Sequence, residues 1–199
     1  DIASNTISID TSVGGWGDLR TMGDYGLITG IHEIGHSLGL GHSGDYNGSA
    51  NYNNDATWAN DTRQYSVMSY FQASHSGADH FGNSGTEYSS TPMLYDILAI
   101  QTIYGANNSA RSGDTTYGFN SNAGRDQFDF TLNTQPVVSI WDSGGNDTLD
   151  FSGYSGSQVI RLGDGEFSDV GGNMTDNVSI AIGAVIENAV GGSGADTIY

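Results

Sequence analysis

The chain has 199 residues, which is enough for one or two domains with hydrophobic cores. Its formal net charge is −18, because 23 acidic residues stand against five arginines and no lysine. Nucleic acids and anionic membranes are poor partners for such an acidic surface, so we expect neither. The sequence contains no cysteine, so stability must come from packing or from bound ions rather than from disulfides.

The first part of the chain predicts short strands followed by a helix. Apolar and polar residues alternate weakly over residues 1–23, which is typical of one or two short strands. A helix is predicted to begin after Asp24, a residue type that caps helix N-termini well. Gly39 is predicted to end it, because glycine adopts positive φ without a steric penalty. Helical spacing predicts four core-facing residues: Leu27, Ile31, Ile34 and Leu38.

This helix carries the central motif of the chain, which reads H-E-x-x-H-x-x-G-x-x-H from His32 to His42. His32 and His36 are about one helical turn apart, so both imidazoles can reach one ion. After Gly39 the chain can turn back and bring His42 in as a third ligand. Three nitrogens with an open position suit a hydrolytic zinc, and Glu33 can reach a water at the metal. A single histidine on an apolar helix is usually a core residue, but five positions in one register favour a zinc-peptidase site.

The segment after the motif predicts a loop and then a tight turn beneath the metal. Residues 43–65 are polar and aromatic, which indicates a long ordered loop tied by its aromatic rings or by an ion. Met68 follows in a turn, and its thioether would form an apolar floor below the ligands. Tyr70 could serve as a movable extra ligand or as a hydrogen-bond donor to an oxyanion. The alternatives are an ordinary core methionine and an ordinary half-buried tyrosine.

A Gly/Ser-rich loop and a second helix complete the first half. His75 and His80 have no helix to align them, so they are interpreted as loop residues rather than as a second metal site. The second helix is predicted to begin with Thr91 as N-cap and Pro92 at the first helical position. It is predicted to end at Gly105 and, being broadly apolar, to be well buried.

A change in composition at 106–109 divides the chain into predicted domains of residues 1–108 and 109–199. The second domain has β-type runs separated by Gly, Asp and Asn turns. The runs lie at 127–130, 137–141, 148–151, 159–162, 178–182 and 185–186. Residues 144–149 are a partial copy, and 191–199 a full copy, of the repeat G-G-x-G-x-D-x-U-x. In this repeat glycine lets backbone carbonyls face a calcium ion, aspartate supplies charge, and U points into a parallel β-roll.

These features together resemble the serralysins, a family of secreted bacterial zinc metalloproteases with a C-terminal calcium β-roll. The resemblance covers nearly the whole chain. Besides the zinc motif, the turn at 66–70 and the repeats, it includes 44–47, 100–107, 117–122, 151–154 and 167–172. It implies an α+β zinc metalloprotease portion with two main helices and a Met-turn. An all-β calcium-binding region of β-sandwich and β-roll type would follow, and the protein would be extracellular.

The resemblance also implies the roles of individual residues. One catalytic zinc would be held by His32, His36 and His42, with Tyr70 as a displaceable fourth ligand and Glu33 as general base. The function would be hydrolysis of peptide bonds in proteins and peptides. Several structural calcium ions would be bound through Arg111, Gly113, Thr115, Asp142, Gly144, Gly145, Asp147, Val185, Glu187, Gly192, Gly194 and Asp196. The first three and Val185 would contribute backbone carbonyls.

Three departures from the serralysin pattern define the alternatives. Ser43 follows the third histidine where serralysins usually have proline and matrixins have serine, which leaves a matrixin-like peptidase as a weaker alternative. Val185 stands where relatives often carry threonine, which is harmless if only its carbonyl binds. Only 31 residues precede His32, and most later repeats are missing, so the chain is interpreted as a fragment. The main alternative is therefore a catalytically incomplete zinc- and calcium-binding β-roll module. A missing N-terminal fragment or a proteinaceous inhibitor would then be a further partner.

Overall fold

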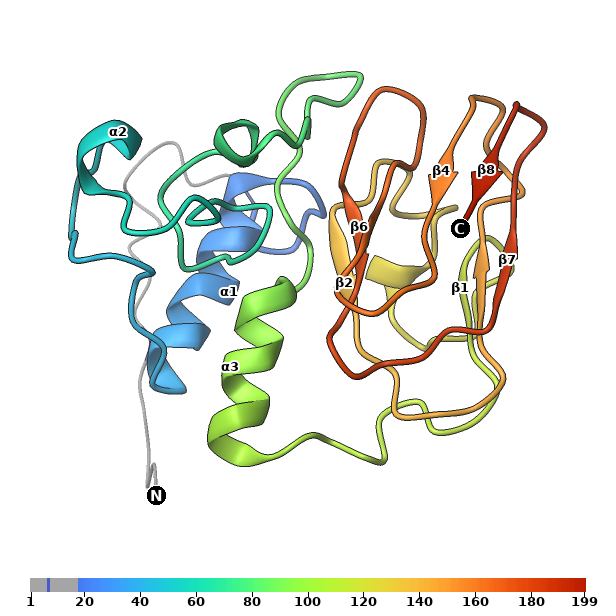
Figure 1. Ribbon diagram of the computed structural model, residues 1–199, viewed down its shortest axis with the longest axis horizontal. Coiled ribbons are helices and arrows are strands. Elements are labelled where there is room, and N and C mark those ends of the chain that lie inside the picture. The colour runs from blue at the N-terminus through green and yellow to red at the C-terminus, as the bar shows by residue number, and fades with distance from the viewer. Residues whose placement is uncertain (1–6, 8–17) are drawn as a thin grey trace.

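The computed structural model describes residue 7 and residues 18–199, so the strands expected near the start of the chain fall largely outside the described residues. Helices gather in one half of the molecule and strands in the other (Figure 1). The elements in chain order are α1 Tyr25–Ser37, α2 Tyr52–Asp55, the 3-10 turn Ala73–Ser76, α3 Leu94–Tyr104, β1 Thr116–Gly118, the 3-10 turn Asp126–Phe128, β2 Val138–Ile140, β3 Thr148–Asp150, β4 Val159–Ile160, β5 Phe167–Ser168, β6 Val178–Ile180, β7 Asn188–Val190 and β8 Thr197–Ile198. None of the helices among the described residues is long and apolar enough to cross a membrane.

Helix α1 begins and ends where the sequence predicts. The Asp24 carboxylate accepts a hydrogen bond from the Gly26 backbone N–H at 3.1 Å, which satisfies one of the free donors of the first turn. Gly39 adopts a φ of +95° directly after the helix. The two helix boundaries are therefore confirmed.

The core-facing side of α1 agrees with the prediction only in part: Ile31 packs against the core, but Ile34 does not. Ile34 is 50% exposed, whereas Ile28, which was not predicted, is only 3% exposed. Ile28 and Gly35 lie two turns apart on the face that packs on Met68 and Met93. Helical spacing shows that α1 has apolar stripes along its surface, but not which stripe packs against the rest of the protein. In the structure, the stripe that carries Ile28 packs against the core.

Helix α3 starts later and is less buried than expected. Its N-cap is Met93, and Asp96 accepts a hydrogen bond from the Met93 N–H at 2.8 Å. The expected cap, Thr91, instead accepts a hydrogen bond from the backbone N–H of Ser139. Among the apolar residues of the helix, Leu94 is buried while Leu98, Ile103 and Tyr104 are exposed. The end at Gly105, with φ of +83°, is confirmed.

The strand half of the molecule is a coil of short parallel strands. Sheets form in the order β1-β3-β7, β2-β6-β5 and β4-β8, and among the paired strands of the described residues only β5 and β6 are antiparallel. Val138 lies opposite Val178, Thr148 opposite Asn188, and Val159 opposite Thr197, so the chain returns to the same place after 40, 40 and 38 residues. This recurrence is the geometry of a coiled, solenoid-like β-structure.

Strands β2, β3, β4 and β6 lie within predicted runs, β8 lies within the predicted repeat 191–199, and β1, β5 and β7 were missed. The run at 127–130 overlaps a 3-10 turn, because Phe128 and Phe130 reach the core from a turn rather than from a strand. The run at 185–186 is not a strand, and pairing begins at Asn188. Strands of two or three residues are too short to show a period-2 pattern.

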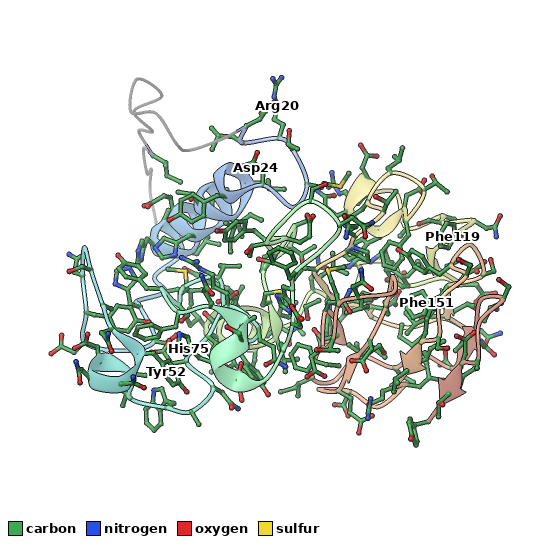
Figure 2. All side chains as sticks on the ribbon, turned by 90° about the horizontal axis from the view of Figure 1, so that it is seen from above. Arg20, Asp24, Tyr52, His75, Phe119 and Phe151 are labelled. Carbon is green, nitrogen blue, oxygen red and sulfur yellow. The ribbon has the colours of Figure 1, made fainter. Side chains whose placement is uncertain are left out.

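Two hydrophobic clusters stabilise the fold. One lies inside the β-coil and includes Phe151, which is fully buried, with Phe119 packed at its edge (Figure 2). The other joins α1 and the segment around Met68 to Phe167 and Met174 from the β-half. The proposed boundary between residues 108 and 109 thus separates two parts that share a core.

His80 marks the seam between the halves. It is 7% exposed, and one ring N–H donates to the backbone carbonyl of Asp176 at 3.2 Å. Neighbouring Asp79 forms a β-bridge with Thr175. Burial lowers the pKa of His80 to about 4. His75, by contrast, is exposed and stacks on Tyr52 with ring centroids 4.3 Å apart (Figure 2).

We expect His80 to make the fold sensitive to mild acid. The unfolded chain takes up this proton near pH 6.5 and the folded chain only near pH 4, so the free energy of unfolding falls as the pH drops between these values. The full effect is at most about 3 kcal/mol, reached near pH 4. Urea denaturation at pH 7, 5.5 and 4.5 should show a shallower pH dependence for His80→Gln than for the parent, with His75→Gln as matched control. Equal slopes for all three chains would contradict this account.

Candidate metal centre

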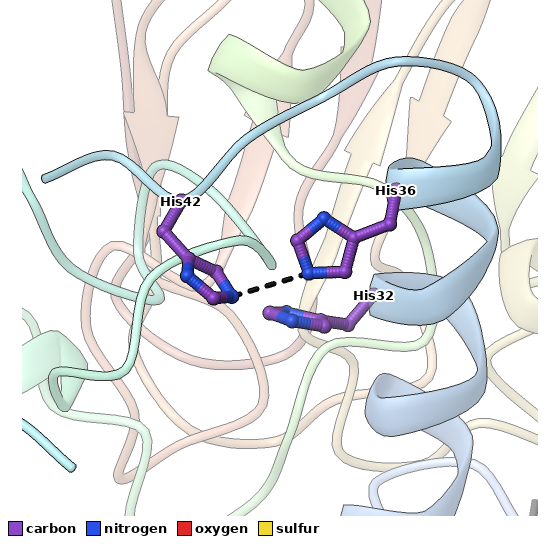
Figure 3. A group of neighbouring side chains, drawn as sticks. All are labelled: His32, His36 and His42. Atoms are coloured by element: carbon purple, nitrogen blue, oxygen red, sulfur yellow. Dashed lines mark hydrogen bonds between the residues drawn. The ribbon is translucent and has the colours of Figure 1, made fainter. Parts of the chain in front are cut away.

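Three histidines converge at the C-terminal end of α1 (Figure 3). The helix supplies His32 and His36, and the chain that turns back after Gly39 supplies His42. One ligand nitrogen from each ring lies within 4.8 Å of the other two. Over residue 7 and residues 18–199, this is the only group of three or more His, Cys, Asp or Glu side chains that lie so close together.

Each of these imidazoles is oriented by a backbone carbonyl at its Nδ1 atom. The partners are Val67 O at 2.8 Å from His32, Leu40 O at 2.8 Å from His36, and Tyr46 O at 2.7 Å from His42. A carbonyl oxygen can only accept, so each Nδ1 carries the hydrogen. In the neutral ring, Nε2 then presents a free lone pair, which is the form that binds metals.

The Nε2 atoms face one another. His36 Nε2 and His42 Nε2 are 3.1 Å apart, and the rings of His32 and His36 pack edge to face. Two lone pairs at this distance repel unless a proton or a cation lies between them, so the donor set fits a metal ion. Burial is the largest cause that lowers the pKa of His32, which favours the neutral ring.

The turn at Val67 and Met68 supports this centre from below. Met68 is 2% exposed, and its Sδ lies 2.6 Å from the position of a Cβ added at Gly35, so the thioether lies directly against the helix between the two ligands. Buried Asp96 fixes the turn, because its carboxylate accepts from Val67 N–H at 2.8 Å and from the Ser66 hydroxyl at 2.6 Å. The start of α3 thereby positions the carbonyl that orients His32.

Glu33 and Tyr70 line the open side of the centre. Together with His32 they border a cavity of about 390 Å³. The Tyr70 ring centroid is 4.6 Å from that of His42 and 6.1 Å from that of His32. Tyr46 stacks on His42 with centroids 5.5 Å apart, and burial is the main reason that its pKa is raised to about 12. The arrangement therefore places a carboxylate and a phenol around one candidate metal site.

Sequence reasoning missed the groups that orient the ligands. The carbonyls of Val67 and Leu40 have no side-chain signature, so no pattern could have identified them. Tyr46 lies in the loop 43–65, for which aromatic contacts were predicted but not a carbonyl that orients His42. Arg63, which also lines the cavity, did carry a signal: it is the only arginine between positions 21 and 110 in a chain without lysine.

Four of the predicted calcium ligands meet between two stacked turns of the β-coil. Asp147 Oδ1 accepts from Thr115 N–H at 2.7 Å, and the Thr115 hydroxyl donates to Gly113 O at 2.8 Å. A Cβ added at Gly145 would lie 2.6 Å from Gly113 O, so only glycine fits this approach. Gly145 has a φ of +150°, a conformation that side chains disfavour.

Two further carboxylates approach the same place. Glu187 accepts a hydrogen bond from the Asp147 N–H at 2.7 Å, and Asp142 accepts one from the Gly144 N–H at 2.8 Å. Asp147 is fully buried, and its Oδ2 has no hydrogen-bond partner among the described residues. Burial raises the pKa of Asp147 most, and the charges of Asp142 and Glu187 raise it further. An uncompensated buried carboxylate beside two others fits a cation.

The remaining predicted calcium ligands either lie in a second cluster or have side chains that face other groups. The Arg111 side chain donates to Tyr117 Oη and to the Trp141 carbonyl, and its backbone has a φ of +53°. Val185 is 61% exposed. Gly192, Gly194 and Asp196 form a second cluster against residues 154–158.

That second cluster repeats the geometry of the first. Asp196 Oδ1 accepts from Gln158 N–H at 2.9 Å, as Asp147 does from Thr115. A Cβ at Gly194 would collide with the carbonyl of Gly156, as one at Gly145 would with that of Gly113. Both turns thus bring a glycine and an aspartate against the preceding turn of the coil.

Comparison with known proteins places this geometry in a family. Residues 106–199 match the family described as Peptidase M10 serralysin C terminal. Metalloprotease AprA of Pseudomonas entomophila is 56% identical over 179 residues, which are 88% of this chain and 37% of that protein. Residues 106–199 therefore belong to the serralysin C-terminal family, and most of the chain is similar to serralysins. Serralysin C of Dickeya chrysanthemi is 54% identical over 178 residues, and serralysin of Proteus mirabilis 51% over 181, each with 36% of the relative covered.

These matches define what the family assignment covers. The chain spans a little over a third of the length of these curated relatives. The assignment supports a β-roll region within the C-terminal part of a mixed α and β fold. It also removes the basis for the matrixin-like alternative that rested on Ser43.

We expect the three histidines to bind one zinc ion per chain. His36→Ala and His42→Ala should each lose the ion, because two nitrogen ligands do not complete the site. His75→Ala should retain it, since His75 lies on Tyr52 outside the group. Metal content after dialysis, measured by atomic emission, checks this. A zinc content in either ligand variant equal to that of His75→Ala would contradict the ligand assignment.

Proposed function

We propose that this chain carries the catalytic centre of a secreted zinc-dependent endopeptidase that hydrolyses peptide bonds in proteins. The observation that carries the proposal is the shared orientation of His32, His36 and His42, each with Nδ1 bound to a carbonyl and Nε2 free. The names of the relatives, metalloprotease and serralysin, agree with it. In this proposal the catalytic portion lies within residues 1–108 and the calcium-binding portion within 109–199.

The metal would be held by the three Nε2 atoms, with Tyr70 as an additional, displaceable ligand. When bound, zinc supplies Lewis acidity that lowers the pKa of a water toward about 7 and polarises a carbonyl. The open side of the histidine group faces the cavity that Glu33 and Tyr70 line, so a peptide can approach there. Met68, against Gly35, keeps the ligand-bearing turn of α1 in place.

Glu33 is the proposed general base. Its place on α1, next to His32, brings the carboxylate to the cavity rather than into the ligand set. It takes the proton from the attacking water and passes it to the leaving amine. Tyr70 donates a hydrogen bond to the oxyanion that forms on the scissile carbonyl.

Calcium ions are proposed to hold the β-coil together. The first site would lie at Asp147, whose Oδ2 lacks a partner among the described residues and whose carboxylate is affected by the charges of Asp142 and Glu187. Carbonyls of the neighbouring turn, from Arg111, Gly113, Gly144 and Gly145, would add neutral oxygens, as would Val185. Gly192, Gly194 and Asp196 would contribute to a further site.

A second candidate function is that of a zinc- and calcium-binding β-roll module without peptidase activity. The observation that favours it is the buried Asp147 carboxylate, whose Oδ2 has no partner among the described residues and which fits a cation in the β-coil. Another polypeptide, such as a proteinaceous inhibitor, would then be its partner. Hydrolysis of casein by the purified chain, with and without a chelator, separates the two functions. Chelator-sensitive cleavage supports the enzyme, whereas bound zinc without cleavage supports the module.

Glu33→Gln should retain the zinc and lose nearly all peptidase activity, because the amide cannot accept the proton. Tyr70→Phe should lower kcat by roughly 10²-fold or more while leaving the metal bound, because one oxyanion donor is lost. Trp58→Phe, a change at an exposed aromatic in the loop, is the control and should leave kcat unchanged. Casein hydrolysis and zinc content, measured on the same samples, check these expectations. Full activity in Glu33→Gln would rule out the mechanism.

Removal of calcium should lower the melting temperature of the chain, because the carboxylates around Asp147 then repel one another. Asp147→Asn should weaken this calcium dependence, and Asp126→Asn, at an exposed aspartate, should not. Differential scanning calorimetry with calcium or with a chelator measures both effects. A melting temperature that does not respond to calcium in the parent chain would overturn the site assignment.

A further inference from the structure

Arg63 is an isolated cation at the edge of the metal cavity. Its guanidinium carbon lies 5.6 Å from the ring centroid of Tyr25 and 5.7 Å from that of Tyr88. These two rings are themselves in edge contact, with centroids 5.2 Å apart. The aromatic rings hold the guanidinium through cation–π contacts that leave its N–H groups free.

No carboxylate of the described chain neutralises this charge. The one ion pair over residue 7 and residues 18–199 joins Arg20 to Asp18, and the hydrogen bonds within this range include none from the Arg63 side chain. This is unexpected in a protein with a formal charge of −18. The nearby carboxylate of Glu87 lies against Gly23 and Gly82 instead. The five N–H donors of Arg63 therefore remain available to a ligand.

Arg63 lies where two cavities meet. The first is the cavity of about 390 Å³ that His32, Glu33 and Tyr70 also line. The second, of about 180 Å³, is bordered by chain segments 72–74, 79–81 and 86–89. Arg63 and Ile28 line both. A peptide that extends from the metal centre into the second cavity passes the guanidinium.

We propose that Arg63 determines specificity by binding a carboxylate of the peptide substrate close to the scissile bond. The carboxylate comes either from an acidic side chain or from a free C-terminus. The planar guanidinium can donate two parallel hydrogen bonds to the two oxygens of such a carboxylate. A peptide amide of the same shape cannot accept both bonds. The inference rests on the proposed peptidase function, because it assigns a substrate feature to the same cavity.

Binding measurements test the proposal without depending on turnover. In the Glu33→Gln background, short peptides that differ only in Glu or Gln at one position, or in a C-terminal acid or amide, are titrated by calorimetry. The acid of at least one pair should bind about tenfold more tightly, as expected for a hydrogen-bonded charged group. Arg63→Gln should remove this preference and leave the affinity for the neutral peptide within about twofold.

Two further variants complete the design. Arg63→Lys should keep part of the preference, because it retains the charge but not the planar fork. Arg125→Gln, at an exposed arginine in the β-half, is the matched control and should keep all of it. A preference within the Glu and Gln pair indicates an acidic side chain, and a preference within the C-terminal acid and amide pair indicates a free C-terminus.

The outcomes for the two proposals are separate. Equal binding of acid and neutral peptides, or a preference that survives Arg63→Gln, overturns the role of Arg63. The same peptides incubated with the parent chain test the peptidase function by mass spectrometry. Binding preference without cleavage would support carboxylate binding by Arg63 and contradict the peptidase function, whereas cleavage without preference would do the reverse.

Discussion

The geometry of the candidate metal centre depends on three hydrogen bonds from imidazole Nδ1 atoms to backbone carbonyls. They fix which nitrogen of each ring is free, and they come from three different places in the chain. Leu40 and Tyr46 flank His42 in the loop after α1, and Val67 lies in a turn that Asp96 of α3 holds. The histidine motif alone supplies ligands, while the surrounding backbone makes them point at one another.

This orientation has an energetic consequence. The Nε2 atoms of His36 and His42 lie 3.1 Å apart, and that proximity is unfavourable between two lone pairs. A cation would convert it into coordination, so metal binding and the fold of the loop 39–46 would be linked. In the β-coil, oxygen atoms rather than nitrogen atoms are brought into unfavourable proximity. There burial and the charges of Asp142 and Glu187 raise the pKa of Asp147, and a bound cation would relieve the repulsion.

The sequence predicted the parts of the molecule that local chemistry determines. Asp24 and Gly39 mark both ends of α1, and His32, His36 and His42 do converge. It failed where distant contacts decide. Ile34 is as apolar as Ile28, but only the latter meets Met68 and Met93 across the core.

Long-range competition explains the other differences. Thr91 is a good capping residue, but its hydroxyl is taken by Ser139 of β2, so Asp96 organises the start of α3. Strands of two or three residues arise because stacked turns bring them together, and no short run of residues encodes that. Gly145 also depends on a distant contact. Only glycine fits at this position because the Gly113 carbonyl of the neighbouring turn lies so close.

The tautomers of the three histidines give the most direct test of this account. Long-range nitrogen–proton NMR correlation on the nitrogen-15-labelled chain reports which ring nitrogen carries the hydrogen. The structure predicts a protonated Nδ1 in His32, His36 and His42 near neutral pH, and a response confined to Nε2 when zinc is added. A hydrogen on Nε2 in the zinc-bound chain, or zinc bound through Nδ1, would contradict the proposed geometry of the centre.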